Sequence, residues 1–434
     1  MKLIKSKKIK KKYRIKKNIK PFVLEQVSNN QQYFASSESK KNAISLAYLN
    51  KKNETSILYD TPNVQLVDIS SYGQIELHNK SNMLIQGENL SVLKSLLNDR
   101  TVAGKIKLIY IDPPFSTQQE FRVGKDRTAT MSPSKNDTLA YSDNLIGAEY
   151  IEFLRERLIL LKELLDDDGS IYLHIDYKIG HYVKILMDEI FGVNNFINDI
   201  TRIKCNPKNF SRMGYGNIKD MILFYSKGKN CVWNEPRVEM TEEDIARLFH
   251  KIDKNGRRYT TNPLHAPGET KNGATGEKWN GLLPPSGRHW RVPPKELSRL
   301  EKLGLIEWSK NGNPRKKIFA DEIFARGKKL QDVWELKDPP YPLYPTEKNI
   351  EMLKRIIQAS SNAGDLVLDC FAGSGTTLLA AEQLKRNWIG IDNSKSAIEI
   401  IVKRLKGTQN INTFTTYKTE EKTNFEYTKT RKAK

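Results

Sequence analysis

The chain has 434 residues, which predicts two or three folded units, and its 38% hydrophobic and 9% aromatic residues exclude disorder of the whole chain. Lys and Arg number 72 against 51 Asp and Glu, so the net charge of +21 favours a polyanionic partner. Three widely separated cysteines argue against a disulfide scaffold or zinc finger, and no apolar run is long enough to cross a bilayer, so we expect a cytoplasmic protein without a membrane partner.

The first 80 residues are expected to form a basic tail and a segment that wraps the folded body. Eleven of the first twenty residues are Lys or Arg and none is acidic. Such a run repels itself, so it either meets phosphate or only keeps the protein soluble. The sequence does not separate these two roles.

Residues 81–227 alternate strand and helix patterns. Strands are expected at the apolar runs 83–85, 106–111, 171–175, 196–203 and 221–225. Leucines at helical spacing predict helices that begin near residues 90 and 154. This alternation predicts a mostly parallel α/β sheet.

The remaining chain divides into three parts. Residues 228–342 are rich in Gly, Pro, Arg and Lys without a sustained period, which indicates an inserted domain. Residues 343–408 return to the α/β pattern, with a helix over 346–359 and strands at 366–369 and 388–391. Residues 409–434 are polar and charged, and we expect a tail.

A glycine-rich turn in the last α/β unit indicates a nucleotide-like cofactor. The strand 366–369 runs into D-C-F-A-G-S-G-T-T, and glycines there let the backbone approach a ligand at the carboxyl end of the sheet. Asp392 ends the next strand at a spacing typical of a ribose ligand. Leu378 departs from the dinucleotide fingerprint, which disfavours pyrophosphate binding. A purely structural turn is the alternative.

A second signal is the tetrapeptide Asp112-Pro113-Pro114-Phe115 at the end of the strand 106–111. Two prolines hold the preceding carbonyls rigidly. Beside a planar ring stacked on Phe115, the Asp112 carboxylate and the Pro113 carbonyl would accept both hydrogens of an exocyclic amine and make its lone pair available. By itself the tetrapeptide is also typical of a simple turn.

Together these segments resemble DNA amino-methyltransferases, which transfer a methyl group from S-adenosyl-L-methionine to N6 of adenine or N4 of cytosine. The matching segments are LIYIDPPF, LDCFAGSGTT, YPTEK, QGENLSVL and GSIYLHID. The catalytic motif precedes the cofactor loop, as in the circularly permuted beta group that includes type III modification subunits and many type II methyltransferases. The resemblance covers about residues 82–227 and 343–405.

The resemblance implies a circularly permuted Rossmann-like sheet with an inserted target-recognition domain. It implies S-adenosyl-L-methionine as the cofactor and the tetrapeptide 112–115 as the catalytic motif, where Phe115 replaces a common Tyr. The residues expected to bind the cofactor are Asp369, Phe371, Gly373, Gly375, Thr376, Asp392, Thr346, Lys348, Glu88 and Asn89.

Basic and aromatic residues in two regions are expected to bind DNA. The segment 204–212 suits a wall of the base pocket, where Phe210 and Phe115 would enclose a flipped base, and clusters in 228–342 suit phosphate or guanine contacts. The expected DNA-binding residues are Lys204, Lys208, Phe210, Arg212, Arg257, Arg258, Arg288, Trp290 and Arg291. A solvated loop at 204–212 and a core position for Trp290 are the alternatives.

The resemblance implies N6-adenine methylation of double-stranded DNA, because cytosine-N4 members of the family more often begin the catalytic motif with Ser and this chain has Asp112. N4-cytosine methylation, a non-catalytic DNA-binding subunit of a restriction-modification complex, and an RNA or protein methyltransferase are the alternatives. A cognate restriction endonuclease and a homodimer stay open as partners. The six histidines show no ligand spacing, so no metal is predicted.

Overall fold

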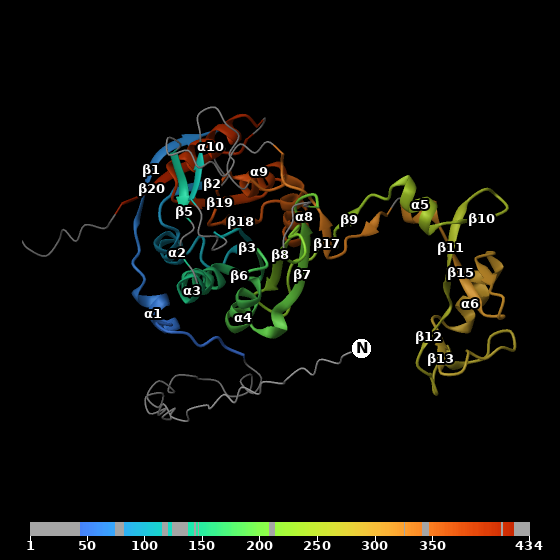
Figure 1. Cartoon of the computed structure of the whole chain (residues 1–434). Coiled ribbons are helices and arrows are strands. Elements are labelled where there is room, and N and C mark those ends of the chain that lie inside the picture. The colour runs from blue at the N-terminus through green and yellow to red at the C-terminus, as the bar shows by residue number, and fades with distance from the viewer. Residues whose placement is uncertain are drawn as a thin grey trace, which may run out of the picture. The chain divides into compact units, whose positions relative to one another are not determined.

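The computed structural model describes residues 44–73, 82–114, 120–123, 138–142, 145, 147–207, 213–324, 326–340, 347–408 and 411–420 (Figure 1). For 120–123 and 138–142 it describes only the backbone, which forms a two-stranded ribbon of β4 (Glu120–Val123) and β5 (Thr138–Ser142).

A ten-stranded sheet occupies the centre, in the order β1-β20-β2-β19-β18-β3-β6-β8-β7-β17. Its strands are β1 (Gln65–Tyr72), β2 (Asn82–Gln86), β3 (Ile106–Ile111), β6 (Leu165–Ile175), β7 (Phe196–Ile203), β8 (Lys219–Ser226), β17 (Val333–Glu335), β18 (Leu366–Asp369), β19 (Asn387–Asp392) and β20 (Phe414–Glu420). The six neighbours from β20 to β6 are parallel, whereas β1 and β8 run antiparallel to their partners. The predicted α/β class and the five expected strands of 81–227 are confirmed.

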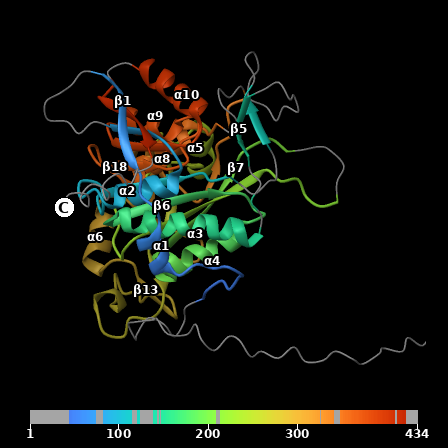
Figure 2. The ribbon, with the colours of Figure 1, turned by 90° about the vertical axis from the view of Figure 1, so that its left-hand side faces the viewer.

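Helices cover both faces of this sheet (Figures 1 and 2). One face carries α2 (Asn89–Leu97), α3 (Gly147–Leu164) and α4 (Gly180–Phe191), with α1 (Glu54–Asp60) against α3, and the other carries α8 (Ile350–Ser360), α9 (Thr376–Gln383) and α10 (Lys395–Lys406). Along β3, Ile109 and Ile111 enter the first core while Leu108 and Tyr110 enter the second. Burial on both faces explains why this strand reads as a continuous apolar run.

The expected helix over 346–359 begins later than predicted. The described helix α8 starts at Ile350, because the Asn349 side chain accepts a hydrogen bond from the Glu351 amide and caps it.

The C-terminal tail prediction is wrong for residues 414–420. These residues form β20, which pairs antiparallel with β1 and parallel with β2. Phe414 is fully buried against Tyr72 and Trp388, so this strand belongs to the core. The segment FTTYKTE is polar in composition but rich in β-formers, and a composition argument misses it. In the segment expected to wrap the body, β1 joins the sheet as its edge strand.

The segment 228–342 contains short elements where the sequence showed no period. A four-stranded sheet has the order β10-β11-β15-β14, and two-stranded pairs are β12 with β13 and β9 with β16. The strands are β9 (Arg237–Val238), β10 (Lys251–Ile252), β11 (Arg258–Pro263), β12 (His265–Pro267), β13 (Arg288–Trp290), β14 (Ile306–Trp308), β15 (Pro314–Phe319) and β16 (Lys328–Lys329). The helices are α5 (Glu242–Leu248), α6 (Pro294–Lys302) and α7 (Ala320–Phe324), and 3₁₀ turns occupy Ala274–Gly276 here and Val193–Asn195 after α4. Strands of two to six residues are too short to produce a readable alternation.

Candidate active site

The two sequence motifs meet at one edge of the sheet. Asp112 follows β3 directly, and the glycine-rich turn follows β18. Because β3 lies between β18 and β6 and all three are parallel, their carboxyl ends lie together. Open α/β sheets bind their ligands at this edge.

The Asp112 carboxylate is largely buried and has two different surroundings. Its Oδ2 lies 2.5 Å from the Nζ of Lys348, in a pair whose side chains are only 16% and 10% exposed. Its Oδ1 is buried and accepts no hydrogen bond from any residue that the structure describes. A buried acceptor without a donor is costly, so this oxygen is suited to a donor on a ligand.

A chain of polar groups continues from Asp112 across three neighbouring strands. The Nδ1 of His174 lies 3.7 Å from Asp112 Oδ1 and 2.9 Å from the Tyr110 hydroxyl, and its Nε2 lies 3.3 Å from Asp220 Oδ2. Lys204 Nζ donates to Asp220 Oδ1 at 2.6 Å. Burial lowers the pKa of His174, although both neighbouring carboxylates oppose the shift. Hydrogen bonds from His174 and Lys204 overcome the burial penalty and lower the pKa of Asp220.

The glycine-rich turn is held by backbone and side-chain contacts. Gly375 has φ +75° and caps α9, and a Cβ there would lie 2.7 Å from Ile401, so both conformation and space require glycine. The Gly373 amide donates to Asp392 Oδ2 at 2.7 Å, and the Phe371 amide donates to Asp369 Oδ1 at 3.0 Å.

Burial raises the pKa of both carboxyls of this turn. The pKa of Asp369 rises to about 7, and that of Asp392 also lies above its usual value. Asp392 Oδ1 accepts from the Ser394 amide at 2.8 Å, so its carboxylate bridges two backbone amides. Its role as a ribose ligand stays a prediction.

Asn89 contacts the turn directly, and Glu88 is linked to it through Arg157. Asn89 Nδ2 donates to the Cys370 carbonyl at 2.9 Å, and Arg157 Nε donates to Asn89 Oδ1 at 2.6 Å. Arg157 also pairs with Glu88 at 2.5 Å, while the second Glu88 oxygen accepts from the Ser91 amide at the start of α2. These contacts fix the position of the turn, and an adenine contact by either residue stays a prediction.

Several site residues carried no clear signal in the sequence. The sequence analysis did not single out Asp220, Arg157 or Arg404. Arg404 Nη1 donates to the Ser374 carbonyl at 2.8 Å, and its Nη2 pairs with Glu347. A charged residue within a buried segment, such as Asp220 before the apolar run 221–225, is the signal that would have helped.

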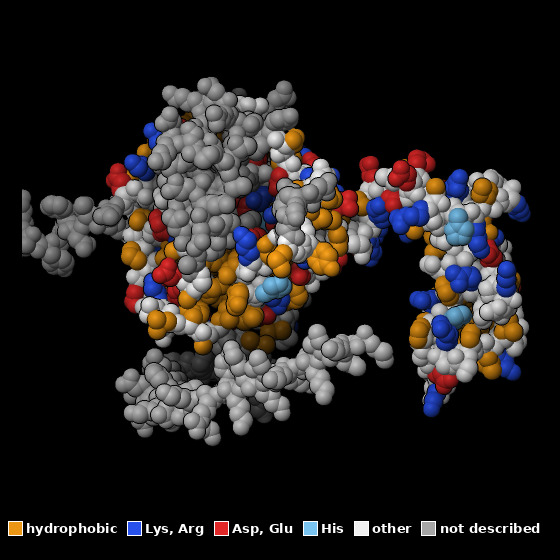
Figure 3. Space-filling model, in the orientation of Figure 1, with side chains coloured by type: hydrophobic (Ala, Val, Ile, Leu, Met, Phe, Trp, Pro, Cys, Tyr) orange, Lys and Arg blue, Asp and Glu red, His pale blue; other side chains and the backbone are white. Residues whose placement is uncertain are grey.

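The predicted DNA-binding residues divide into three groups. Lys208, Phe210 and Arg212 lie outside the described residues, as do Phe115 and Thr346 of the other predicted sites. Arg258, Arg288 and Arg291 are exposed, and Figure 3 shows several Lys and Arg side chains on the visible face of the segment 228–342. The DNA contacts of these three arginines stay predictions. The third group consists of Trp290, which is buried, and of Arg257 and Lys204, which already pair with carboxylates of the protein.

The prediction that Trp290 contacts DNA is wrong. It is 1% exposed, packs edge-on against Trp279 and donates from Nε1 to the Glu277 carbonyl at 3.0 Å. The aromatic ring is therefore core, as its alternative stated. Arg257 stacks on Phe319 and makes two hydrogen bonds of 2.9 Å to Asp321, which satisfies its charge internally. Lys204 likewise pairs with Asp220.

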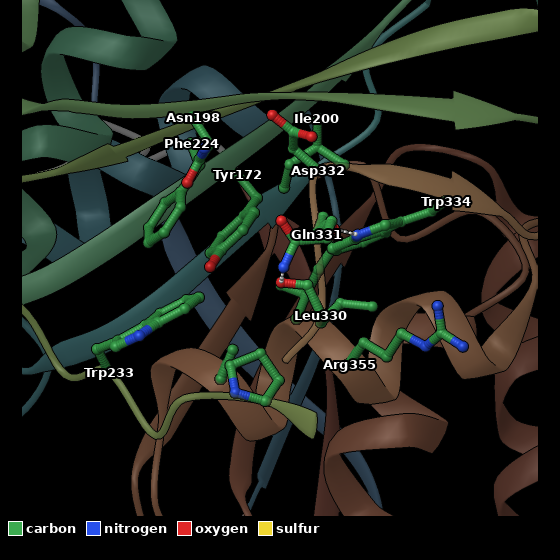
Figure 4. Close-up of a pocket in the computed structure, with 13 residues that line it drawn as sticks. Tyr172, Asn198, Ile200, Phe224, Trp233, Leu330, Gln331, Asp332, Trp334 and Arg355 are labelled. Carbon is green, nitrogen blue, oxygen red and sulfur yellow. Dashed lines mark hydrogen bonds between the residues drawn. The ribbon is translucent and has the colours of Figure 1, made fainter. Parts of the chain in front are cut away.

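A separate cavity of about 170 Å³ lies on the face covered by α8 (Figure 4). Its aromatic wall is Tyr172, Phe224 and Trp233, of which the first two stack at 4.1 Å. None of the predicted site residues lines it. It is therefore distinct from the edge at which the two motifs meet.

The glycine-rich turn, the acidic end of β19 and the rigid Asp112 define the class of protein. The turn contains Gly373 and Gly375, and Asp392 supplies an acidic group that accepts from the Gly373 amide, which fits a nucleoside cofactor. An α/β sheet with this glycine-rich turn and a largely buried carboxylate at the same edge is typical of a methyltransferase that uses S-adenosyl-L-methionine.

Comparison with known proteins gives the family. The family model for N6/N4 methyltransferases, described as DNA methylase, matches residues 106–403. The type II methyltransferase M.EcaI of Enterobacter cloacae is 42% identical over 83% of this chain and 77% of its own length. The chain therefore belongs to the N6/N4 DNA methylase family, and S-adenosyl-L-methionine is its cofactor.

Two further matches are more distant. The EcoP15I Mod subunit of Escherichia coli, a type III restriction-modification enzyme, is 25% identical over 78% of this chain, which spans 62% of the subunit. The crystal structure of the M1.HpyAVI–SAM complex covers 74% of this chain and 100% of its own, with 20% identity and a TM-score of 0.37.

No described helix is long and apolar enough to cross a membrane, and the described residues contain no cluster of three or more metal-ligating side chains.

Proposed function

We propose that the protein methylates the N6 amino group of a flipped-out adenine in double-stranded DNA, as the modification enzyme of a restriction-modification system. The observation that carries this proposal is the buried Asp112 Oδ1, which has no donor among the described residues and lies at the same sheet edge as the cofactor turn. Asp at this position rather than Ser favours adenine over cytosine, as the resemblance implies. N4-cytosine methylation is the second candidate.

The mechanism needs only acceptors and positioning from this chain. Asp112 Oδ1 and the Pro113 carbonyl accept the two amine hydrogens, which draws the nitrogen lone pair out of ring conjugation. Lys348 holds the other carboxylate oxygen at 2.5 Å, which fixes the orientation of the carboxylate. The bound cofactor supplies an electrophilic methyl group. Since a duplex hides the amine, flipping the base costs a few kcal/mol, offset by stacking and phosphate contacts.

We also propose a permuted Rossmann-like body with the recognition domain inserted within 228–342, a range whose strand β17 belongs to the central sheet. The chain order supports the permutation, because the strand before Asp112 precedes the strand before the cofactor turn in sequence. The inserted segment carries 22 Lys and Arg against 16 Asp and Glu, which supports a DNA partner. A cognate endonuclease partner is proposed from the restriction-modification names of the relatives.

The test incubates unmethylated DNA of varied sequence with labelled S-adenosyl-L-methionine, digests the DNA and identifies the labelled nucleoside by mass. We expect N6-methyladenine, whereas N4-methylcytosine would reverse the assignment of the base. The variant D112A should lose about 100-fold or more in kcat, because the amine acceptor is gone. Calorimetry should show cofactor binding in D112A, and an active D112A would remove Asp112 from the mechanism.

A further inference from the structure

We propose that His174 and Asp220 are positioning residues for Asp112: Asp220 holds His174 in the tautomer whose Nδ1 carries no proton, so that Asp112 Oδ1 stays available to the target amine. This inference rests on the proposed role of Asp112. It assigns a task to two buried polar residues that the methyl transfer itself does not use.

The polar side chains come from adjacent strands and face the same side of the sheet. Tyr110 lies on β3, His174 on β6 and Asp220 on β8, three neighbours in the sheet order. His174 is fully buried and Asp220 is 2% exposed. Burying these groups is costly unless each is hydrogen-bonded, and the distances of 2.9 Å and 3.3 Å meet that condition.

The charges around Asp220 determine where the imidazole proton lies. Lys204 Nζ donates to Asp220 Oδ1 at 2.6 Å, and Arg202 lies 4.0 Å from Oδ2. These cations keep Asp220 ionised, and an ionised carboxylate can only accept. His174 must therefore donate from Nε2. A neutral imidazole has one N–H, so Nδ1 is left as an acceptor, and the Tyr110 hydroxyl donates to it.

This proton placement matters because of one distance. His174 Nδ1 lies 3.7 Å from Asp112 Oδ1, which is too far for a hydrogen bond, and no described residue donates to this oxygen. A proton on Nδ1 would turn that nitrogen into a donor aimed at Oδ1, and a shift of well under 1 Å would complete the bond. The amine of the base would then compete with the protein for its acceptor.

The substitution D220N tests the tautomer with little change in shape. Asparagine has one oxygen, which Lys204 will take because lysine can only donate. The amide NH₂ then faces His174 Nε2 and forces the proton onto Nδ1. We expect kcat at saturating DNA and cofactor to fall on the order of 10-fold or more, as when an imidazole is held in the wrong tautomer. Cofactor affinity should stay within about 2-fold, since the cofactor turn is untouched.

D338N is the matched control. Asp338 also pairs with a buried cation, Arg202, but touches neither His174 nor Asp112. The same loss of charge at this site should leave kcat near that of the wild type. An equal fall of kcat in D338N and D220N would show a general structural effect and overturn the proposal.

Nitrogen NMR of wild-type protein with ¹⁵N-labelled histidine reads the tautomer directly and does not depend on whether a variant folds. The His174 signals are assigned by substituting the five other histidines in turn. A protonated Nε2 supports the proposal, and a protonated Nδ1 in the wild type overturns it. If D220N has normal kcat and D112A is inactive, the positioning role of Asp220 and His174 is refuted and the role of Asp112 stands. If D112A is active, the proposed function itself is refuted.

Discussion

Among single residues, Asp369 shows how burial of one carboxyl makes the stability of the protein depend on pH. Its carboxyl is 2% exposed, and burial, with smaller contributions from Asp112 and Asp392, raises its pKa to about 7. Hydrogen bonds from Thr377 and the Phe371 amide oppose the shift. Because the folded pKa exceeds the unfolded one near 3.8, the folded state holds the proton more tightly. The contribution of the Asp369 carboxyl to the free energy of unfolding is therefore fully present below about pH 4 and is lost as pH rises through about 7.

The substitution D369N should remove this loss. Asparagine is neutral at every pH, and its oxygen can still accept from the Phe371 amide. Between about pH 5 and about pH 8, the wild type should lose stability relative to D369N. We expect the difference between their free energies of unfolding to change by up to roughly 3 kcal/mol over this range. Urea denaturation without cofactor measures it. A difference that does not change with pH would show that Asp369 does not titrate in this range.

Among the elements, β20 shows that a polar composition does not make a segment a tail. It pairs on both sides, with β1 and with β2, and its register brings Phe414 between the rings of Tyr72 and Trp388. Thr415 and Thr416 are buried as well, whereas Lys418 and Glu420 are exposed. The strand therefore contributes to the core mainly through its first three residues.

The substitution F414A should destabilise the protein by about 3–5 kcal/mol, because it removes a fully buried ring and leaves a cavity. The control is K418A, on the same strand and exposed, which should stay within about 0.5 kcal/mol of the wild type. Urea denaturation of both variants measures the two effects. If both substitutions had equally small effects, residues 414–420 would be a tail, as their composition predicted, and not part of the core.

For the whole molecule, the segment between β9 and β16 offers a direct test of the proposed recognition domain. Val238 pairs with Lys328 and Arg237 with Lys329, so the two ends of the segment lie next to each other as an antiparallel ribbon. The chain can therefore be closed there by a two-residue hairpin turn.

Replacing residues 239–327 with Asn-Gly should keep cofactor binding and abolish methylation of DNA. The described contacts of the cofactor turn involve residues outside this segment, which is why we expect calorimetry to give a cofactor affinity within about 3-fold of the wild type. Sequence-specific methylation of DNA in the shortened protein would show that recognition lies elsewhere in the chain.

The sequence by itself determined the α/β class, the parallel core strands, the position of Asp112 directly after a buried strand and the glycine-rich turn. These features are local: a strand buried on both faces is an apolar run, and a turn that needs positive φ requires glycine, as Gly375 does. The resemblance added the family and the cofactor because its motifs are local too.

Only the tertiary structure decided which distant residues meet. Lys348 reaches Asp112 across 236 positions of the chain, and Asp220 reaches His174 because β8 pairs antiparallel with β6. Trp290 reads as a surface contact in the sequence, yet it is buried, and Arg257 makes an exposed ion pair with Asp321 from a distant part of the segment. Such pairings depend on strand order and register, which no short segment of sequence encodes.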